Sequence, residues 1–305
     1  MKTSNMRISL SLIFLMIIYT FSGCTDILGT FEPAGEKDPV TIPKSTYSTL
    51  ILDIDLGVGS ITFDVIPTAT YLVDVVNAVS IREGSDGTLD EAKAVISSEI
   101  NTDTMKISFD SGDDNIQVDY KYDSTIKVAN NISLQINFLA ATGEIFADLT
   151  DKSVTVSSFY VEATTGTITL SLGEFLMFDS SPTVKTTTGN QDVTVTNLKY
   201  VSTTTWSITG MTGGINLDLT DNLPQNLTGS TTHLFNLDCT TGSIDVISDL
   251  SLGIGLQITA SVTTGTIDVP GSGDSYTSPN FASSLLKYDF TIITTTGGIT
   301  FTEEG

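Results

Sequence analysis

The chain has 305 residues, 36 acidic against 13 basic side chains, a formal net charge of −23 and 40% hydrophobic residues. This length and hydrophobic content are sufficient for a sizeable core within one domain. The excess of negative charge repels phosphate backbones and anionic lipid surfaces, which argues against nucleic acid as a partner.

Residues 1–24 have the features of a secretory signal: basic residues at the start, an apolar run over 8–21, and small residues before Cys24. The ending Ser22-Gly23-Cys24 resembles the lipobox of prokaryotic lipoproteins, in which a signal peptidase cleaves before a cysteine that carries lipid, although Phe21 stands where leucine is usual. The resemblance implies lipidation at Cys24, a membrane anchor, and an extracytoplasmic location at the cell surface or in the envelope. An uncleaved anchor and an ordinary signal peptide are the alternatives, and both also place the rest of the chain outside the cytoplasm.

Residues 25–45 combine three prolines and two glycines with charges of both signs. This composition predicts a flexible, extended tether between the membrane and the domain. The remainder, residues 46–305, is expected to form a single domain.

This domain is organised by a repeated corner, of which Thr164-Thr165-Gly166-Thr167-Ile168 is a clear copy. From Gly143 to Gly297 the corner glycines are separated by 23, 23, 24, 29, 23 and 32 residues. Self-similarity with a period of about 20 to 50 residues indicates stacked supersecondary units. The structural corners are Gly59, Gly143, Gly166, Gly189, Gly213, Gly242, Gly265 and Gly297.

Apolar residues alternate with polar ones on both sides of each glycine, as in Phe159 and Val161 before Gly166, and Ile168 and Leu170 after it. A period of two is typical of a strand with one buried face. Each repeat therefore reads as strand, glycine corner, strand. We expect an all-β fold, a repetitive parallel β-solenoid (β-helix) of about eight coils spaced about 4.8 Å apart. An antiparallel meander folded into a sandwich explains the alternation equally well, but the fixed corner spacing less well.

Residues 68–133 interrupt the repeats before the regular array of residues 134–302 begins. We interpret this excursion as a cap at the N-terminal end, because a solenoid must cover its terminal coil. Within it, Thr88-Leu89-Asp90-Glu91 is a capping-box pattern that predicts a short helix. At the other end, the last coil is expected to be the one that ends at Phe301.

Two long steps in the array mark insertions around residues 221–233 and 270–285. Inserted loops on a repeat scaffold often cluster on its binding face, and tolerated surface loops are the alternative. The candidate binding-loop residues, all expected at the surface, are Asn226, His233, Asp274 and Tyr276.

The corners and their flanking alternation resemble the putative-adhesin β-repeat family of bacterial and archaeal surface proteins. The resemblance covers residues 46–302 and depends on eight copies in register. It implies a parallel β-solenoid behind a lipoprotein signal or membrane anchor, a role in adhesion or envelope sensing, and no defined catalytic residues. Gly189-Asn190-Gln191 departs from the motif, and we expect a local bulge there in which Val193 replaces the missing isoleucine.

The remaining residues offer little catalytic chemistry. His233 has no second histidine and no Cys–His spacing, which a catalytic triad or a zinc site needs. Cys239 and Trp206 occupy apolar positions of the repeat and are expected in the core. We assign no catalytic residues. Calcium is the one candidate cofactor, and its candidate ligands are the loop carboxylates Asp110, Asp113 and Asp114, which lack the full spacing of a known calcium loop.

These observations predict a cell-surface, lipid-anchored, non-catalytic protein. It would bind a surface protein or a glycan through the polar outer faces and inserted loops of the solenoid. An envelope carbohydrate-active enzyme on a β-helix is the leading alternative, because paired acids such as Asp218 and Asp221 occur on the repeats. The two differ in whether acids from neighbouring coils converge in one groove. A structural surface-coat component, which would self-associate without a foreign ligand, is the third hypothesis.

Overall fold

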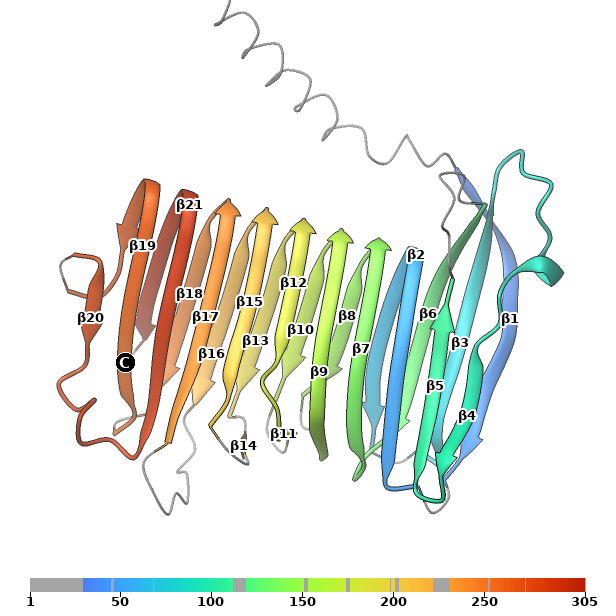
Figure 1. Ribbon diagram of the computed structural model, residues 1–305, viewed down its shortest axis with the longest axis horizontal. Helices are drawn as coiled ribbons and strands as arrows, with labels where there is room; N and C mark the ends of the chain where they lie inside the picture. The colour runs from blue at the N-terminus through green and yellow to red at the C-terminus, as the bar shows by residue number, and fades with distance from the viewer. Residues whose placement is uncertain are drawn as a thin grey trace, which may run out of the picture.

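The structure is a computed structural model, and it describes residues 30–44, 47–67, 69–111, 119–150, 153–173, 176–197, 199–200, 203–221, 231–251, 253–271 and 273–304. These residues are all-β, and their 21 strands belong to one large, mostly parallel sheet (Figure 1). The only helical element that they contain is a 3₁₀ turn, η1 (Leu89–Glu91).

Most strands form two facing rows that meet at the glycine corners. The front row in Figure 1 leads up to the corners and consists of β7 (Ser133–Thr142), β9 (Val154–Thr165), β12 (Thr183–Thr188), β15 (Thr205–Thr212), β17 (Thr231–Thr241) and the first halves of β2 (Thr49–Ile66), β19 (Gly255–Asp268) and β21 (Leu286–Glu304). The back row leads away from the corners and consists of β8 (Ile145–Leu149), β10 (Ile168–Leu172), β13 (Gln191–Thr196), β16 (Ile215–Asp221), β18 (Ile244–Leu250) and the second halves of β2, β19 and β21. We call a front strand together with the back strand that continues it a layer. Neighbouring layers are parallel and in register, with one shift between Leu134 and Gln135 where β7 pairs with β9. A short third run pairs β11 (Leu176–Phe178) with the start of β9 and with β14 (Lys199–Tyr200).

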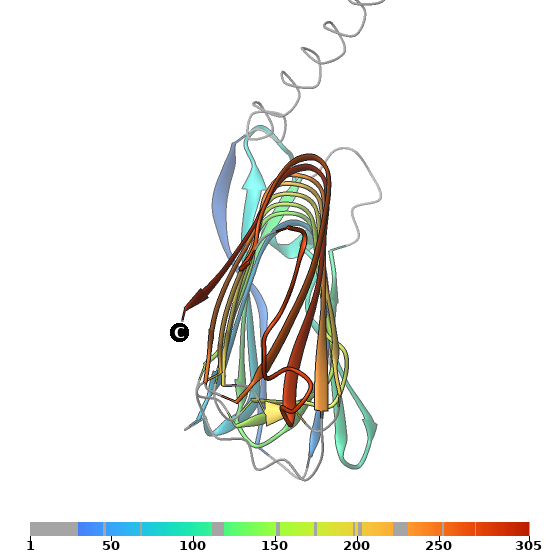
Figure 2. The same ribbon diagram turned by 90° about the vertical axis from the view of Figure 1, so that its left-hand side faces the viewer.

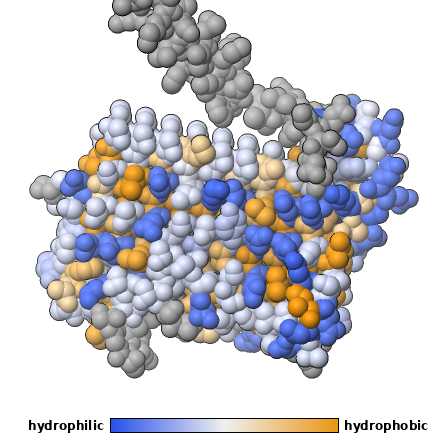
Figure 3. Space-filling view, viewed as in Figure 1, coloured by the Kyte–Doolittle hydropathy of each residue, from blue (hydrophilic) through white to orange (hydrophobic). Residues whose placement is uncertain are grey.

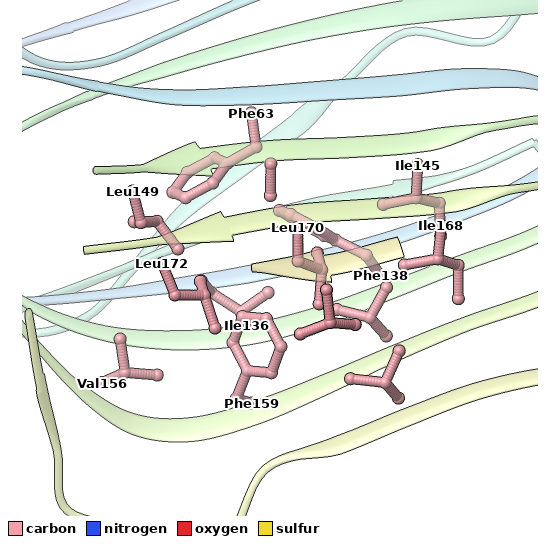
Figure 4. Packing of buried hydrophobic residues seen from close by; sticks show 14 of the residues in the cluster. Phe63, Ile136, Phe138, Ile145, Leu149, Val156, Phe159, Ile168, Leu170 and Leu172 are labelled. Atoms are coloured by element: carbon pink, nitrogen blue, oxygen red, sulfur yellow. The ribbon is translucent and has the colours of Figure 1, made fainter. Parts of the chain in front are cut away.

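The space between the two rows is filled by the apolar side chains of the alternating pattern (Figure 4). Aromatic rings contact one another from layer to layer, with centroids 5.2 Å apart for Phe178 and Trp206, and 5.5 Å for Trp206 and Phe235. Phe290 continues this column at 4.9 Å from Phe235. Trp206 and Cys239 are fully buried, so their predicted place in the core is confirmed.

The corner glycines lie directly over one another. Gly166 has a φ of +147°, a conformation that favours glycine, and a Cβ added to it would lie 1.5 Å from the carbonyl oxygen of Gly143. The same overlap with the corner glycine of a neighbouring layer, at 1.5 to 2.0 Å, recurs at Gly143, Gly189, Gly213, Gly242, Gly265 and Gly297. Only glycine lets the backbones approach this closely at the corner.

The layers do not follow sequence order at the C-terminal end. β21, the last strand of the chain, pairs with β17 and β18 on one side and with β19 on the other (Figure 1). The terminal layer is therefore β19, and the expectation that the copy ending at Phe301 comes last is wrong. The long connection between β19 and β21 contains β20 (Ser275–Thr277), which lies antiparallel on the outer edge of β19.

Residues 69–111 and 119–129 lie on the N-terminal side of β2. Here β5 (Thr104–Asp110) and β6 (Tyr120–Ala129) pair in parallel with the two halves of β2. Next to them, β4 (Ile96–Asn101) lies antiparallel to β5, and β3 (Tyr71–Arg82) lies antiparallel to β6. The predicted helix is no more than the η1 turn with its Thr88–Glu91 capping box, because the chain is already extended at Ala92.

Two strands form the outer edges at this end, β4 beside β5 and β1 (Phe31–Pro43), which lies antiparallel to β3. The flexible tether predicted for residues 25–45 is therefore wrong over this range. An edge strand needs hydrogen bonds on one side only, so it tolerates prolines that would break a central strand. Register shifts between Pro33 and Gly35 and between Lys37 and Val40 accommodate the remaining irregularity.

Gln191 occupies the isoleucine position of its layer without a bulge. β13 stays in register with β10 and β16, and Val193 keeps its own position. The buried Gln191 amide donates from Nε2 to Thr186 Oγ1 at 2.8 Å and to the carbonyl oxygen of Thr209 at 2.6 Å. The predicted bulge is wrong because hydrogen bonds, not a register shift, accommodate the polar side chain.

We expect Gly166→Ala to destabilise the protein by about 3 kcal/mol or more, because the added Cβ must displace the Gly143 carbonyl as well as strain the backbone. The control is Gly253→Ala, since Gly253 also has a positive φ, +104°, but no atom within 4 Å of the added Cβ. Urea unfolding followed by circular dichroism measures both. Equal losses would show that backbone strain, and not the stacked carbonyl, makes the corner glycine necessary.

Candidate binding surfaces

The predicted site residues are scattered over the chain. Four of them lie outside the described residues: Cys24, Asp113, Asp114 and Asn226. Asp110 is exposed at the end of β5, where it pairs in register with Asp55 of β2. Burial raises the pKa of Asp55, and the neighbouring Asp110 and Asp53 carboxylates raise it further.

His233 is buried, and the prediction of a surface position is wrong. Its side chain is 1% exposed, and its ring lies 5.8 Å from that of Tyr288. The backbone N–H of Thr204 donates to His233 Nδ1 at 3.3 Å, and Thr204 Oγ1 lies 3.0 Å from the same atom. Tyr288 donates to Asp221 Oδ2 at 2.7 Å. A buried polar cluster thus lies at the start of β17, and burial lowers the pKa of His233 to about 4.

Asp274 and Tyr276 belong to the segment that covers the terminal layer. The carbonyl oxygen of Asp274 accepts the N–H of Ala260 at 2.7 Å. Tyr276, in β20, pairs with Ile258 and packs against the core. Burial raises the pKa of Tyr276, and the nearby Glu303 carboxylate adds to this effect. Both residues therefore hold the end of the stack together.

The outward side chains of the front row form a flat, mixed surface, whose pale, evenly spaced upper edge in Figure 3 is the row of corners. Glu162 accepts hydrogen bonds from Tyr160 Oη and, at 2.9 Å, from Lys185 Nζ. Burial acts to raise the pKa of Glu162, but these two hydrogen bonds outweigh it and the pKa is lowered. Asp53 is held in the same way by Lys106 Nζ at 2.7 Å. These front-row carboxylates are thus engaged by neighbouring strands.

The back row carries a surface groove of about 300 Å³ that crosses β13, β16 and β18. Pairing register places two lines of outward side chains across it: Asp192, Asn216 and Asp245 in one, and Thr194, Asp218 and Ile247 in the other. Acids from three neighbouring strands therefore meet in one groove, which the sequence could not show.

Hydrogen bonds order part of this groove. Asn216 Nδ2 donates to Asp192 Oδ1 at 2.6 Å, and Ser243 Oγ donates to Asp245 Oδ2 at 3.0 Å. Ile247 is 43% exposed beside them. The groove combines carboxylate acceptors with a largely apolar lining, so it suits a ligand that carries hydroxyl or amine donors next to an apolar face.

The described part of the chain contains no group of three or more His, Cys, Asp and Glu side chains that could hold a metal ion. It also contains no helix of the length and hydrophobicity required to cross a membrane.

Several solved structures are similar to this chain. A putative cell adhesion protein from Clostridium sporogenes aligns with 90% of this chain and 100% of its own, at 15% identity and a TM-score of 0.41. Putative adhesins from Parabacteroides merdae and Bacteroides fragilis cover 91% and 87% of this chain and 98% and 97% of their own, at 11% identity and TM-scores of 0.26 and 0.25. No protein-family model and no curated protein matches the sequence. At these TM-scores the likeness transfers no function, so the chain's own residues must indicate one.

The buried neutral imidazole of His233 predicts that the free energy of unfolding decreases as the pH is lowered. Its pKa is lowered from 6.5 to about 4 on folding, so between these values the unfolded state binds more protons and the free energy of unfolding increases with pH. His233→Asn retains an acceptor for Thr204 and removes this titration. Between pH 6.5 and pH 4 we expect the parent to lose on the order of 3 kcal/mol more than the variant.

Chemical denaturation of both proteins at the two pH values measures this difference. The other titrating groups are common to both chains and cancel. Parallel pH profiles would contradict the assignment to His233.

Proposed function

We propose that this chain is a lipid-anchored, non-catalytic binding protein of a prokaryotic cell surface, built as a β-solenoid of about eight glycine-cornered coils. The in-register pairing of successive layers and the glycine-on-glycine corners support the solenoid. The basic start, apolar run and Cys24 of residues 1–24 support the anchor. The binding role is carried by one observation, the groove across β13, β16 and β18.

This groove fits a ligand that donates hydrogen bonds. Asp192, Asp218 and Asp245 supply carboxylate acceptors, and Ile247 supplies an apolar contact. A surface glycan offers hydroxyl donors next to apolar C–H faces, and a surface protein offers lysine and amide donors. The lines of side chains cross three strands at spacings of about 4.8 Å, so an extended ligand can contact several layers at once.

We expect Asp218→Asn to weaken binding of the labelled full chain to intact cells of the source organism by about tenfold, because hydrogen bonds to a charged acceptor contribute about 1.5 to 3 kcal/mol. The matched control is Asp148→Asn. Asp148 lies five residues after its corner glycine, as Asp218 does, but it is outside the groove. Flow cytometry measures both. If the two variants bind alike, the groove is not the ligand site.

Treating the cells with protease or with glycosidase before the assay distinguishes a protein ligand from a glycan. Calcium at Asp110, Asp113 and Asp114 stays a prediction, and the same assay with a chelator tests it. Loss of binding that Asp110→Asn reproduces would support a calcium site there.

A carbohydrate-active enzyme is the second candidate, and the same groove favours it. Asp192 and Asp245 lie on either side of Asn216 in one line across the strands. Their Cα atoms are therefore separated by two strand spacings, about 10 Å. Inverting glycosidases hold their two carboxyl groups about 6.5 to 9.5 Å apart. Incubation with envelope polysaccharide separates the two functions: new reducing ends that Asp192→Asn abolishes would indicate an enzyme, and binding without cleavage would indicate the adhesin-like role.

Anchoring is tested independently of the groove. We expect the parent chain to take up labelled fatty acid and to sediment with membranes, and Cys24→Ala to do neither, because the lipid attaches to the Cys24 thiol. Fractionation and fluorography measure both properties. A Cys24→Ala chain that still sediments with membranes would indicate an uncleaved apolar anchor over residues 8–21.

A further inference from the structure

The outer edge of the terminal layer is open over half its length. β20 pairs with Gln257–Thr259 of β19, and Asp274 reaches Ala260. From Ser261 to Asp268, no strand among the described residues pairs with the side of β19 that faces away from β21. Figure 1 shows β20 beside the lower part of β19 only, and Figure 2 views this end directly.

Backbone groups point out of this open edge. In the inner layers the residue two after the corner glycine donates its N–H to the next layer, as Ile145 does to Thr167 at 2.9 Å. Ile267 has this position in the terminal layer, so its N–H is directed away from the stack. Before the corner, Ala260 already donates outward, and strand alternation directs Val262 to the same side.

The side chains at this edge are incompletely covered. Val262 and Ile267 are only partly buried. The equivalent residues of an inner layer, Ala163 and Ile168, are both 0% exposed. The terminal layer thus lacks the neighbour that would bury its apolar row.

At the opposite end of the stack, one of the two outermost strands is protected against strand addition. This strand, β1, carries three prolines and several charged residues and has register shifts, features that prevent strand addition. Residues 261–268 contain no proline and no basic residue, and Asp268 is their one acid. In a chain of net charge −23, this nearly neutral edge is a surface that a second copy can approach without strong repulsion.

We propose that two copies of this chain join through the open edge, related by a two-fold axis through the Thr264–Gly265 corner. The edge rises to this corner and descends after it, so the rotation places residues 261–264 of one copy antiparallel to residues 265–268 of the other. Val262 then lies opposite the partner's Ile267, and both direct their backbone groups into the interface. Each such pair exchanges two backbone hydrogen bonds and covers two partly buried apolar side chains. A two-fold contact uses the same edge of both copies, so the assembly closes as a dimer.

This dimer does not depend on the proposed groove or on the lipid anchor. Its geometry can be tested with cysteines, because the two-fold axis places Thr263 opposite the partner's Thr266. Opposite residues in an antiparallel pair have Cα atoms about 4.5 to 5.5 Å apart, within disulfide range. Full-length Thr263→Cys and Thr266→Cys chains, both with Cys24→Ala, are mixed and oxidised.

We expect a cross-linked dimer from the mixture and little from either variant alone. The matched control is the pair Thr164→Cys and Thr167→Cys, which hold the same corner positions in an inner layer covered on both sides. Cross-linking of the control mixture to the same extent would overturn the proposal, because it would show random collision.

A second measurement avoids oxidation. Sedimentation equilibrium of the full chain should show a dimer that Thr263→Glu/Thr266→Glu weakens by about tenfold or more, since like charges then lie opposite one another. Thr164→Glu/Thr167→Glu should leave it unchanged, and melting temperatures check that both variants fold. A parent chain that sediments as a monomer at all concentrations overturns the proposal. This holds whether the edge is left free or is covered by a strand of a different protein.

Discussion

The contact on which the rest of the structure depends is the carbonyl oxygen of one corner glycine under the Cα of the next. Parallel strands must repeat about every 4.8 Å to form their hydrogen bonds, and a chain that reverses between two facing rows must keep that spacing at the bend. At Gly166 a Cβ would lie 1.5 Å from the oxygen below it, so no other residue satisfies both requirements. Each corner sets the inward or outward direction of the residues on both sides. This is how Asp192, Asn216 and Asp245 come to lie in one line on the outer face.

Most of this architecture could be predicted from the sequence because the signal is local. A glycine with apolar residues two and four positions after it specifies a corner and the face that is buried, and Trp206 and Cys239 follow from the same count. His233 obeys this rule too. It alternates in phase with Phe235 and Leu237, all three of which are buried. The insertion next to His233 suggests a surface position, but the alternation is the stronger signal because it determines which face of the strand is buried.

The errors arose where a partner distant in sequence decides the outcome. Residues 31–43 have the composition of a linker, and only the free edge of β3 makes them a strand. Gln191 breaks the apolar pattern, yet its amide finds Thr186 five residues away and the Thr209 carbonyl in the next layer. Neither partner is visible in a local pattern. The groove also depends on contacts between residues distant in sequence. Its acids lie on adjacent copies of the repeat, 26 or more residues apart, and only the register of three strands brings them together.

The order of the last two layers shows that side-chain packing can override sequence order in a repeat. β19 and β21 carry equivalent corners, so backbone geometry alone would allow either strand to pair with β17. Phe290 of β21 stacks on Phe235 at an interplanar angle of 21° and continues the aromatic column. β19 has Ile258 at that position and would end the column. With β21 inside, Tyr288 also reaches Asp221 in the buried cluster. The layer with smaller side chains is then left at the end, where Tyr276 covers Ile258 and the corner of Gly265 remains open. The same packing preference that completes the core therefore exposes the edge at this end.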